Sequence, residues 1–155
     1  MIQRIQSVYR LLAGVLSAVA FFTPLANFTR ETALCVMYAT SFSVYGDPSA
    51  FGQVPSLPWG VMVFSLLSVL LPLYCIFKYR NRKSQMRLCL LTEIAYLVYY
   101  AAYIAYGVAI ARDNDANLTP TLFAILPLIA FIAVILARKA IKSDEEKVRA
   151  ADRIR

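Results

Sequence analysis

The most informative absence in this sequence is histidine, of which the chain has none. The commonest metal ligand and the commonest general base of enzymes are therefore both missing. Charged residues are also scarce, at 16% of the chain, where a typical soluble domain has about a quarter. The three cysteines, Cys35, Cys75 and Cys89, have no paired spacing and predict neither a zinc site nor a disulfide framework. These gaps argue against a soluble metalloenzyme, and we expect no metal and no cofactor.

What the sequence does contain is long apolar runs, in a chain of 155 residues that is 60% hydrophobic. A membrane-spanning helix needs about 20 predominantly apolar residues. Four segments meet this requirement, at about 8–26, 57–79, 88–111 and 119–138. The sequence therefore predicts an all-α integral membrane protein, with a four-helix transmembrane bundle in a domain of residues 1–142. The first segment follows basic residues as a signal peptide would, but the proline of "PLA" makes a poor cleavage site, so we expect it to be retained.

The basic residues indicate how these helices are oriented. Most of the 16 lysines and arginines precede the first segment, lie between the second and third, or follow the fourth; Arg30 and Arg112 fall on the other side. Positively charged flanks stay in the cytoplasm, so we expect both termini inside and a long outer loop, residues 27–56. The net charge of +7 then reflects topology and contact with anionic lipids. We expect no nucleic-acid partner, because no basic motif interleaved with aromatic residues occurs.

Two segments outside the apolar runs have patterns of their own. In the outer loop, "YATSFSVY" at 38–45 alternates in the way that is typical of a β-strand, and turn residues follow it. The tail, residues 143–155, begins with Ser143 and Glu146 at the spacing of a capping box. We therefore expect a short β-like cap on the outer side and a separate short C-terminal helix in the cytoplasm.

One carboxylate lies inside an apolar run. Glu93 is followed at helical spacing by Tyr96, Tyr100 and Tyr103, so the four side chains share one face of the third segment. An ionised acid within the bilayer costs on the order of a few kcal/mol unless it is paired, protonated or hydrated. This polar face has two interpretations: a path that handles protons or cations, or buried structural groups, with the acid bonded to tyrosine hydroxyls or reaching toward Arg87. We expect no second acid and no basic residue within a span to complete a relay.

Small residues recur every four positions in three of the apolar runs, which favours close helix packing. They are Gly14 and Ala18 in the first run, Ala101, Ala105 and Ala109 in the third, and Ala133 and Ala137 in the fourth. We expect these rows to pack against the other spans or against a helix of another protein.

The two ends of the chain carry a resemblance. The start, "MIQRIQSVYRLLAGVLSAVAFFTPLA", and the end, "ARKAIKSDEEKVRAADRIR", resemble a family of Bacteroidetes inner-membrane proteins, domain of unknown function 4293. The resemblance extends over the whole chain and implies a four-span protein of the bacterial inner membrane. It implies no activity, ligand or catalytic residue. It does draw attention to charged residues of the two ends, Arg4, Asp152, Arg153 and Arg155, as a cytoplasmic docking surface.

Two functions are open from the sequence. The first is a non-catalytic accessory or scaffold subunit of a larger inner-membrane complex, with other membrane proteins or further copies of the chain as partners. The second is a small transporter or membrane enzyme that uses Glu93 and the tyrosine face. The sequence contains no catalytic triad, paired carboxylates or phosphate-binding glycine motif, so we expect the first.

Overall fold

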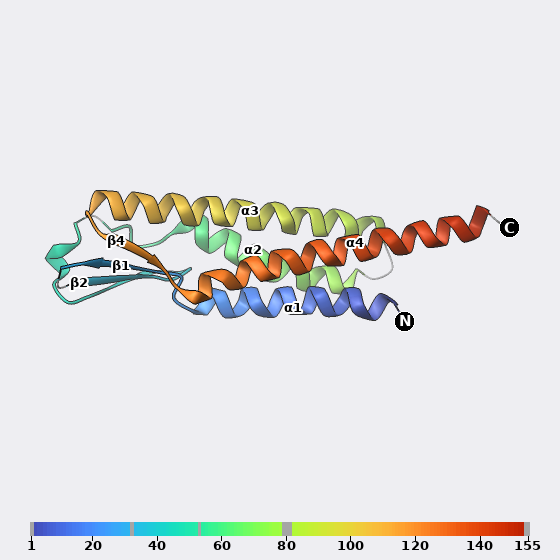
Figure 1. Cartoon of the computed structure of the whole chain (residues 1–155), viewed down its shortest axis with the longest axis horizontal. Coiled ribbons are helices and arrows are strands. Elements are labelled where there is room, and N and C mark those ends of the chain that lie inside the picture. Colours follow the sequence, from blue (N-terminus) through green and yellow to red (C-terminus); the bar gives the residue numbers. More distant parts are fainter. Residues whose placement is uncertain (1, 32, 53, 79–81, 154–155) are drawn as a thin grey trace.

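The computed structural model describes residues 2–31, 33–52, 54–78 and 82–153 of the chain. Within these ranges, four long helices run along the molecule (Figure 1): α1 (Ile2–Phe22), α2 (Trp59–Phe77), α3 (Arg82–Asp113) and α4 (Leu126–Arg153). Each contains an apolar stretch that is long enough to cross a membrane. By the length and composition of its helices, the chain is therefore a multi-pass membrane protein, as predicted.

The bundle has two chemically different ends. At one end lie the start of α1, the end of α2, the start of α3 and the last turns of α4; we call it the basic end (Figure 1). At the other end a small β-sheet covers the helices, and we call it the sheet end. The two ends are separated by the full length of the helices, so each polar group can be placed by its distance from them.

The first helix ends earlier than the predicted span of 8–26. α1 stops at Phe22 because Pro24 lacks a backbone N–H and disfavours helical geometry at the residue before it. The Thr23 hydroxyl closes the last turn by donating to the Val19 carbonyl at 3.0 Å. The apolar residues after this proline enter the sheet instead of the bilayer span.

The fourth helix begins later than the predicted span of 119–138. The first residues of the predicted span belong instead to a strand, β4 (Asn117–Pro120), and then to a 3-10 turn, η2 (Leu122–Ile125). The proline that ends the strand cannot donate a helical hydrogen bond, so the α-helix starts beyond it. The segments at 57–79 and 88–111 do fall on α2 and α3, although α3 is longer at both ends.

The predicted separate helix at 143–155 was wrong for the described part of the tail, because α4 continues through it without interruption. Ile141 is buried against the bundle, and the residues around it are good helix formers, so the helix passes through the capping-box signal at Ser143. Lys142 and Glu146, one turn apart, come within 4.0 Å of each other. As a result, α4 projects beyond the other helices at the basic end (Figure 1).

The sheet has four antiparallel strands in the order β3-β2-β1-β4. Three come from the segment between α1 and α2, namely β1 (Ala26–Arg30), β2 (Ala33–Met37) and β3 (Phe42–Tyr45), and β4 comes from the connection between α3 and α4. Only β3 falls in the predicted strand at 38–45. The outer cap is therefore larger than expected. No strand pattern in the sequence predicted β2, which is a plain apolar run, or β4, which lies in the connection between α3 and α4.

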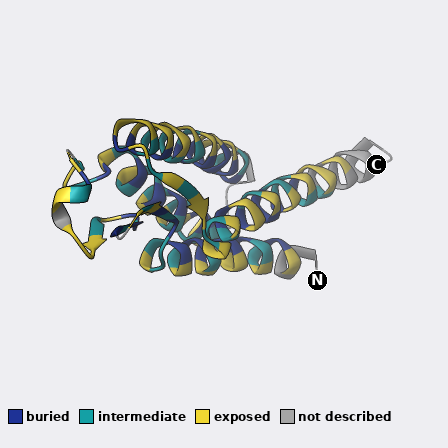
Figure 2. Cartoon of the chain, turned by 60° about the vertical axis from the view of Figure 1, so that its left-hand side comes forward, coloured by how far each residue is buried: buried dark blue, intermediate teal, exposed yellow. Residues whose placement is uncertain are grey.

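Two buried clusters hold these parts together. At the sheet end, Phe28, Cys35 and Met37 pack with Tyr99 and Ile110 of α3, so the sheet shares its core with the helices. At the basic end a second set packs α1 to α4 together: Ala13, Cys75, Cys89, Tyr96, Ala130, Ala133, Val134 and Ile141. Figure 2 shows the outward faces of the helices exposed and their facing sides buried. Those outward faces are apolar, as lipid contact requires.

Candidate functional site

Glu93 lies between α3 and α4, where it faces Arg138. The Arg138 Nε is 3.0 Å from the Glu93 Oε1, so the two form an ion pair. The contact is an ion pair without a hydrogen bond, and this oxygen has no hydrogen-bond partner among the described residues. The acid is the more buried member, with 10% of its side chain exposed against 38% for the arginine. The expectation of no basic residue within a span was wrong here, because the apolar stretch of α4 extends past Arg138.

Tyr96 is fully buried where α1, α2 and α3 meet. Its hydroxyl donates to the Ser68 carbonyl of α2 at 3.3 Å. The Ser17 hydroxyl of α1 lies 2.6 Å from the same phenol oxygen and can donate to it. This tyrosine therefore joins three helices through polar contacts that an apolar surrounding strengthens.

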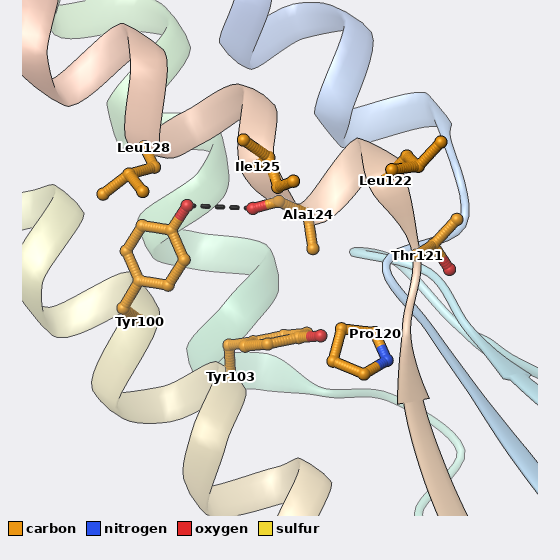
Figure 3. Close-up of a pocket in the computed structure, with 8 residues that line it drawn as sticks. All are labelled: Tyr100, Tyr103, Pro120, Thr121, Leu122, Ala124, Ile125 and Leu128. Carbon is orange, nitrogen blue, oxygen red and sulfur yellow. Dashed lines mark hydrogen bonds between the residues drawn. The ribbon is translucent and has the colours of Figure 1, made fainter.

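Tyr100 and Tyr103 lie nearer the sheet end and turn toward the start of α4 (Figure 3). The Tyr100 hydroxyl donates to the Ala124 carbonyl at 2.9 Å, and the Tyr103 hydroxyl donates to the Leu25 carbonyl at 3.2 Å. Both carbonyls lie outside the four long helices: Ala124 is in η2, and Leu25 directly precedes β1. The predicted polar face thus exists as one side of α3, and each member of it contacts a different element.

A pocket of about 310 Å³ lies beside these two rings. It is lined by Tyr100, Tyr103, Pro120, Thr121, Leu122, Ala124, Ile125 and Leu128 (Figure 3). Its surface is almost entirely apolar, and several of its aliphatic side chains are also exposed on the outside of the bundle. It is a space for hydrocarbon more than for a polar substrate.

A second polar cluster, which sequence reasoning missed, lies at the basic end. Arg10 belongs to α1 and is only 2% exposed, although its sequence position was interpreted as preceding the span. Its Nη1 donates to the Cys75 carbonyl at 3.2 Å, and Gln85 Nε2 donates to the same oxygen at 3.5 Å. The Arg10 Nε and Nη2 are buried without a hydrogen-bond partner in the described chain. The position of an arginine inside "SVYRLLAGV" was the signal for this site.

Cys75 and Cys89 lie side by side in this cluster. Their Sγ atoms are 3.9 Å apart, and both thiols are buried and free. Their spacing in the sequence, which predicted neither a zinc site nor a disulfide framework, gave no sign that these two thiols lie together. Cys75 lies near the end of α2 and Cys89 in the first turns of α3, and the packing of these two consecutive helices brings the thiols together.

Acidic and amide side chains complete the basic end. Gln6 of α1 donates from Nε2 to the Asp144 Oδ2 of α4, which ties the projecting helix to the bundle. Within the described ranges, no three cysteine, aspartate or glutamate side chains gather closely enough to hold a metal ion.

The predicted small-residue rows differ in where they lie. A Cβ on Gly14 would come 2.8 Å from the Leu73 Cδ2, so this glycine does allow α1 and α2 to approach closely. Ala18 is half-buried, while Ala133 and Ala137 are buried in the bundle. The row on α3 does not pack within the chain: Ala101, Ala105 and Ala109 are all exposed.

Two titratable groups of the cap, Cys35 and Asp47, have shifted pKa values. Burial raises the pKa of the Cys35 thiol, which is enclosed between the sheet and the helices. Hydrogen bonds from the side chain and the backbone N–H of Ser49 lower the pKa of the Asp47 carboxyl, which caps a short 3-10 turn. Neither group is near the two polar clusters of the bundle.

The proposed docking residues of the two ends fall outside what the structure describes. This holds for the side chains of Arg4, Asp152 and Arg153 and for the whole of Arg155. The docking surface therefore stays a prediction.

Comparisons with known proteins bear on the chain as a whole. No curated protein matches it. The model of one family, described as a domain of unknown function (DUF4293), matches residues 2–154, nearly the whole chain. The match covers all four helices and all four strands, so it agrees with the resemblance noted at the two ends. The chain belongs to the DUF4293 family.

Proposed function

We propose that the protein is a non-catalytic accessory or scaffold subunit of a larger protein complex in the bacterial inner membrane. The observation that carries this proposal is the outer face of α3. Ala101, Ala105 and Ala109 are exposed there, next to the larger exposed side chains of Ile104 and Val108. A row of small residues flanked by larger ones lets a second transmembrane helix approach closely, and van der Waals contact drives such pairing in lipid.

The internal contacts of α3 support the same role. Its polar side chains point inward and bond to α1, α2 and α4, while its smooth face points outward. One side of α3 is fixed by the bundle, and the other side has no helix of this chain packed against it. Such a helix is suited to bind a further transmembrane helix. We propose a helix of another membrane protein as that neighbour, with a second copy of this chain as the alternative.

The distribution of charge supports an orientation with the basic end in the cytoplasm. The start of α1, the turn between α2 and α3 and the end of α4 together carry most of the lysines and arginines. The projecting part of α4 would then lie in the cytoplasm beside anionic lipid headgroups. This part of α4 is the second surface on which a partner subunit could dock.

Mild-detergent purification of the full chain, tagged at one terminus, tests the proposal. We expect a defined assembly that contains other membrane proteins. Ala105→Leu should weaken it by about 1 kcal/mol, or about fivefold in association. Val63→Phe, which enlarges an exposed side chain on α2, is the matched control and should leave recovery unchanged. A lone chain of 17.4 kDa, or a homo-oligomer, in the wild-type preparation would contradict the proposal.

The second candidate, a small transporter or membrane enzyme that uses Glu93, has weaker support. Glu93 already faces Arg138, and the hydroxyls of Tyr96, Tyr100 and Tyr103 already donate to backbone carbonyls. We therefore expect Glu93→Gln to leave the assembly intact. Loss of the assembly in this variant would mean that the acid does more than fill a polar position in the bundle.

A further inference from the structure

We propose that Cys75 and Cys89 form a redox-active dithiol, which a small hydroperoxide oxidises to an intramolecular disulfide. The two Sγ atoms are 3.9 Å apart across the α2–α3 hairpin. Formation of a bond of about 2.05 Å needs the two Sγ atoms to approach each other by roughly 2 Å. The Cys75 Sγ also lies 3.6 Å from the Gln85 carbonyl, which keeps this thiol on the side facing α3.

Arg10 affects the reactivity of the two thiols. A buried guanidinium needs a negative partner, since an unpaired charge in the bundle is costly. Of the described carboxylates at this end, Glu93 is paired with Arg138, Asp144 accepts from Gln6, and the exposed Glu146 faces Lys142. The thiol pair lies next to Arg10, because the guanidinium donates to the backbone of Cys75.

A guanidinium beside the pair favours one thiolate over two neutral thiols. A neighbouring cation promotes the thiolate form, and the thiolate is the nucleophile in cysteine oxidation. The same cation disfavours binding of a metal ion to the pair. Arg10 acts here as a positioning residue, since it touches neither the oxidant nor the sulfur–sulfur bond.

The oxidation proceeds in two steps. One thiolate attacks an oxygen of the hydroperoxide; the O–O bond breaks, a sulfenic acid forms, and the leaving hydroxide or alkoxide takes up the proton that the thiol lost. The second sulfur then attacks the sulfenic sulfur, the S–S bond forms, and the departing hydroxide takes the second thiol proton and leaves as water. The two sulfurs together lose two electrons and the peroxide gains two.

Burial selects the oxidant. Cys75 and Cys89 are 1% and 2% exposed, so a protein disulfide cannot reach them by thiol exchange. A small neutral hydroperoxide needs far less opening of the bundle than a folded disulfide oxidoreductase does. The product would join two helices across 14 residues of sequence at the basic end, where the bundle connects to the projecting α4.

The test is oxidation of the purified full chain in detergent with hydrogen peroxide, followed by alkylation under denaturing conditions and mass spectrometry. We expect a peptide that links Cys75 to Cys89, while Cys35 is recovered as the alkylated thiol. Cys35→Ser is the matched control, because it removes another buried cysteine and should leave the linked peptide unchanged. Separate sulfinic or sulfonic acids on Cys75 and Cys89, or disulfides between chains, would overturn the proposal.

The role of Arg10 is tested by the rate of the same reaction. Arg10→Gln should slow the oxidation about tenfold, the scale on which a neighbouring cation changes the thiolate population. Arg10→Lys should restore most of the rate, since it retains the charge without the guanidinium geometry. Equal rates in the wild type and in a folded Arg10→Gln variant would show that the arginine does not activate the thiols. The peptide mapping of the wild-type chain shows whether the disulfide forms, and this result does not depend on whether the Arg10 variants fold.

Discussion

Replacement of Arg138 by glutamine should destabilise the protein much more than replacement of Glu93 by glutamine, although both remove the same ion pair. Glu93 is the buried partner and cannot reach water when Arg138 is gone. It can escape an unpaired charge by taking up a proton. From an ordinary carboxyl pKa near 4.3, this costs about 3.7 kcal/mol at pH 7 and about 1 kcal/mol at pH 5. These values are upper limits to the loss in Arg138→Gln.

The reverse change should be mild. With glutamine at position 93, Arg138 keeps its charge at a side chain that is 38% exposed, so solvent can compensate for the lost partner. A partly exposed pair contributes about 0 to 1 kcal/mol, and Glu93→Gln should lose no more than that. The double variant, with neither charge, should be more stable than Arg138→Gln alone.

Reversible unfolding in mixed micelles, followed by circular dichroism between pH 5 and pH 8, measures these differences. We expect the Arg138→Gln variant to fold with a proton on Glu93, because the folded bundle then offers its charge no partner. Its loss of stability should then be smallest at low pH and grow as the pH rises. Equal losses in the two single variants, or a loss in Arg138→Gln that does not depend on pH, would refute the reasoning.

Two further changes test the packing and the cap. Gly14→Ala should cost about 1–3 kcal/mol, because its Cβ would meet Leu73 at 2.8 Å; combined with Leu73→Ala it should lose less than the sum of the single variants, measured by the same unfolding assay. Cys35 should react with a maleimide at pH 7 at least about tenfold more slowly than a cysteine placed at exposed Tyr45 in a Cys35→Ser chain, since its thiol is buried with a raised pKa. Similar alkylation rates would mean that the sheet opens readily.

The four helices could be predicted from apolar runs alone, because hydrocarbon thickness imposes a minimum length on each span. Their ends could not, because they depend on competition between hydropathy and backbone chemistry. Pro24 and Pro120 move apolar residues out of helices, whereas buried Ile141 carries α4 through a polar start signal. A local sequence pattern indicates which secondary structure a segment favours, but packing against the rest of the fold determines which structure forms.

The polar groups were likewise predictable within one helix and unpredictable between helices. The shared face of Glu93 and its tyrosines follows from the period of one helix, so it was predictable. The pairing of Glu93 with Arg138, and of Cys75 with Cys89, depends on how two helices are set side by side. A single sequence holds no direct record of that arrangement. The outward direction of Ala105 was hidden for the same reason, because small residues suit both an internal and an external contact.

The pairing of β1 with β4 has a consequence for how the protein is made. Thr29 of β1 and Asn117 of β4 are bonded across 88 residues of sequence, and two helices are synthesised between them. Until α2 and α3 have been made, β1 has an unpaired edge, and such an edge can pair with a foreign strand. The arrival of β4, which directly follows α3, closes that edge, so the sheet is complete only after the third helix. A chain that stalls before β4 would leave the edge of β1 open.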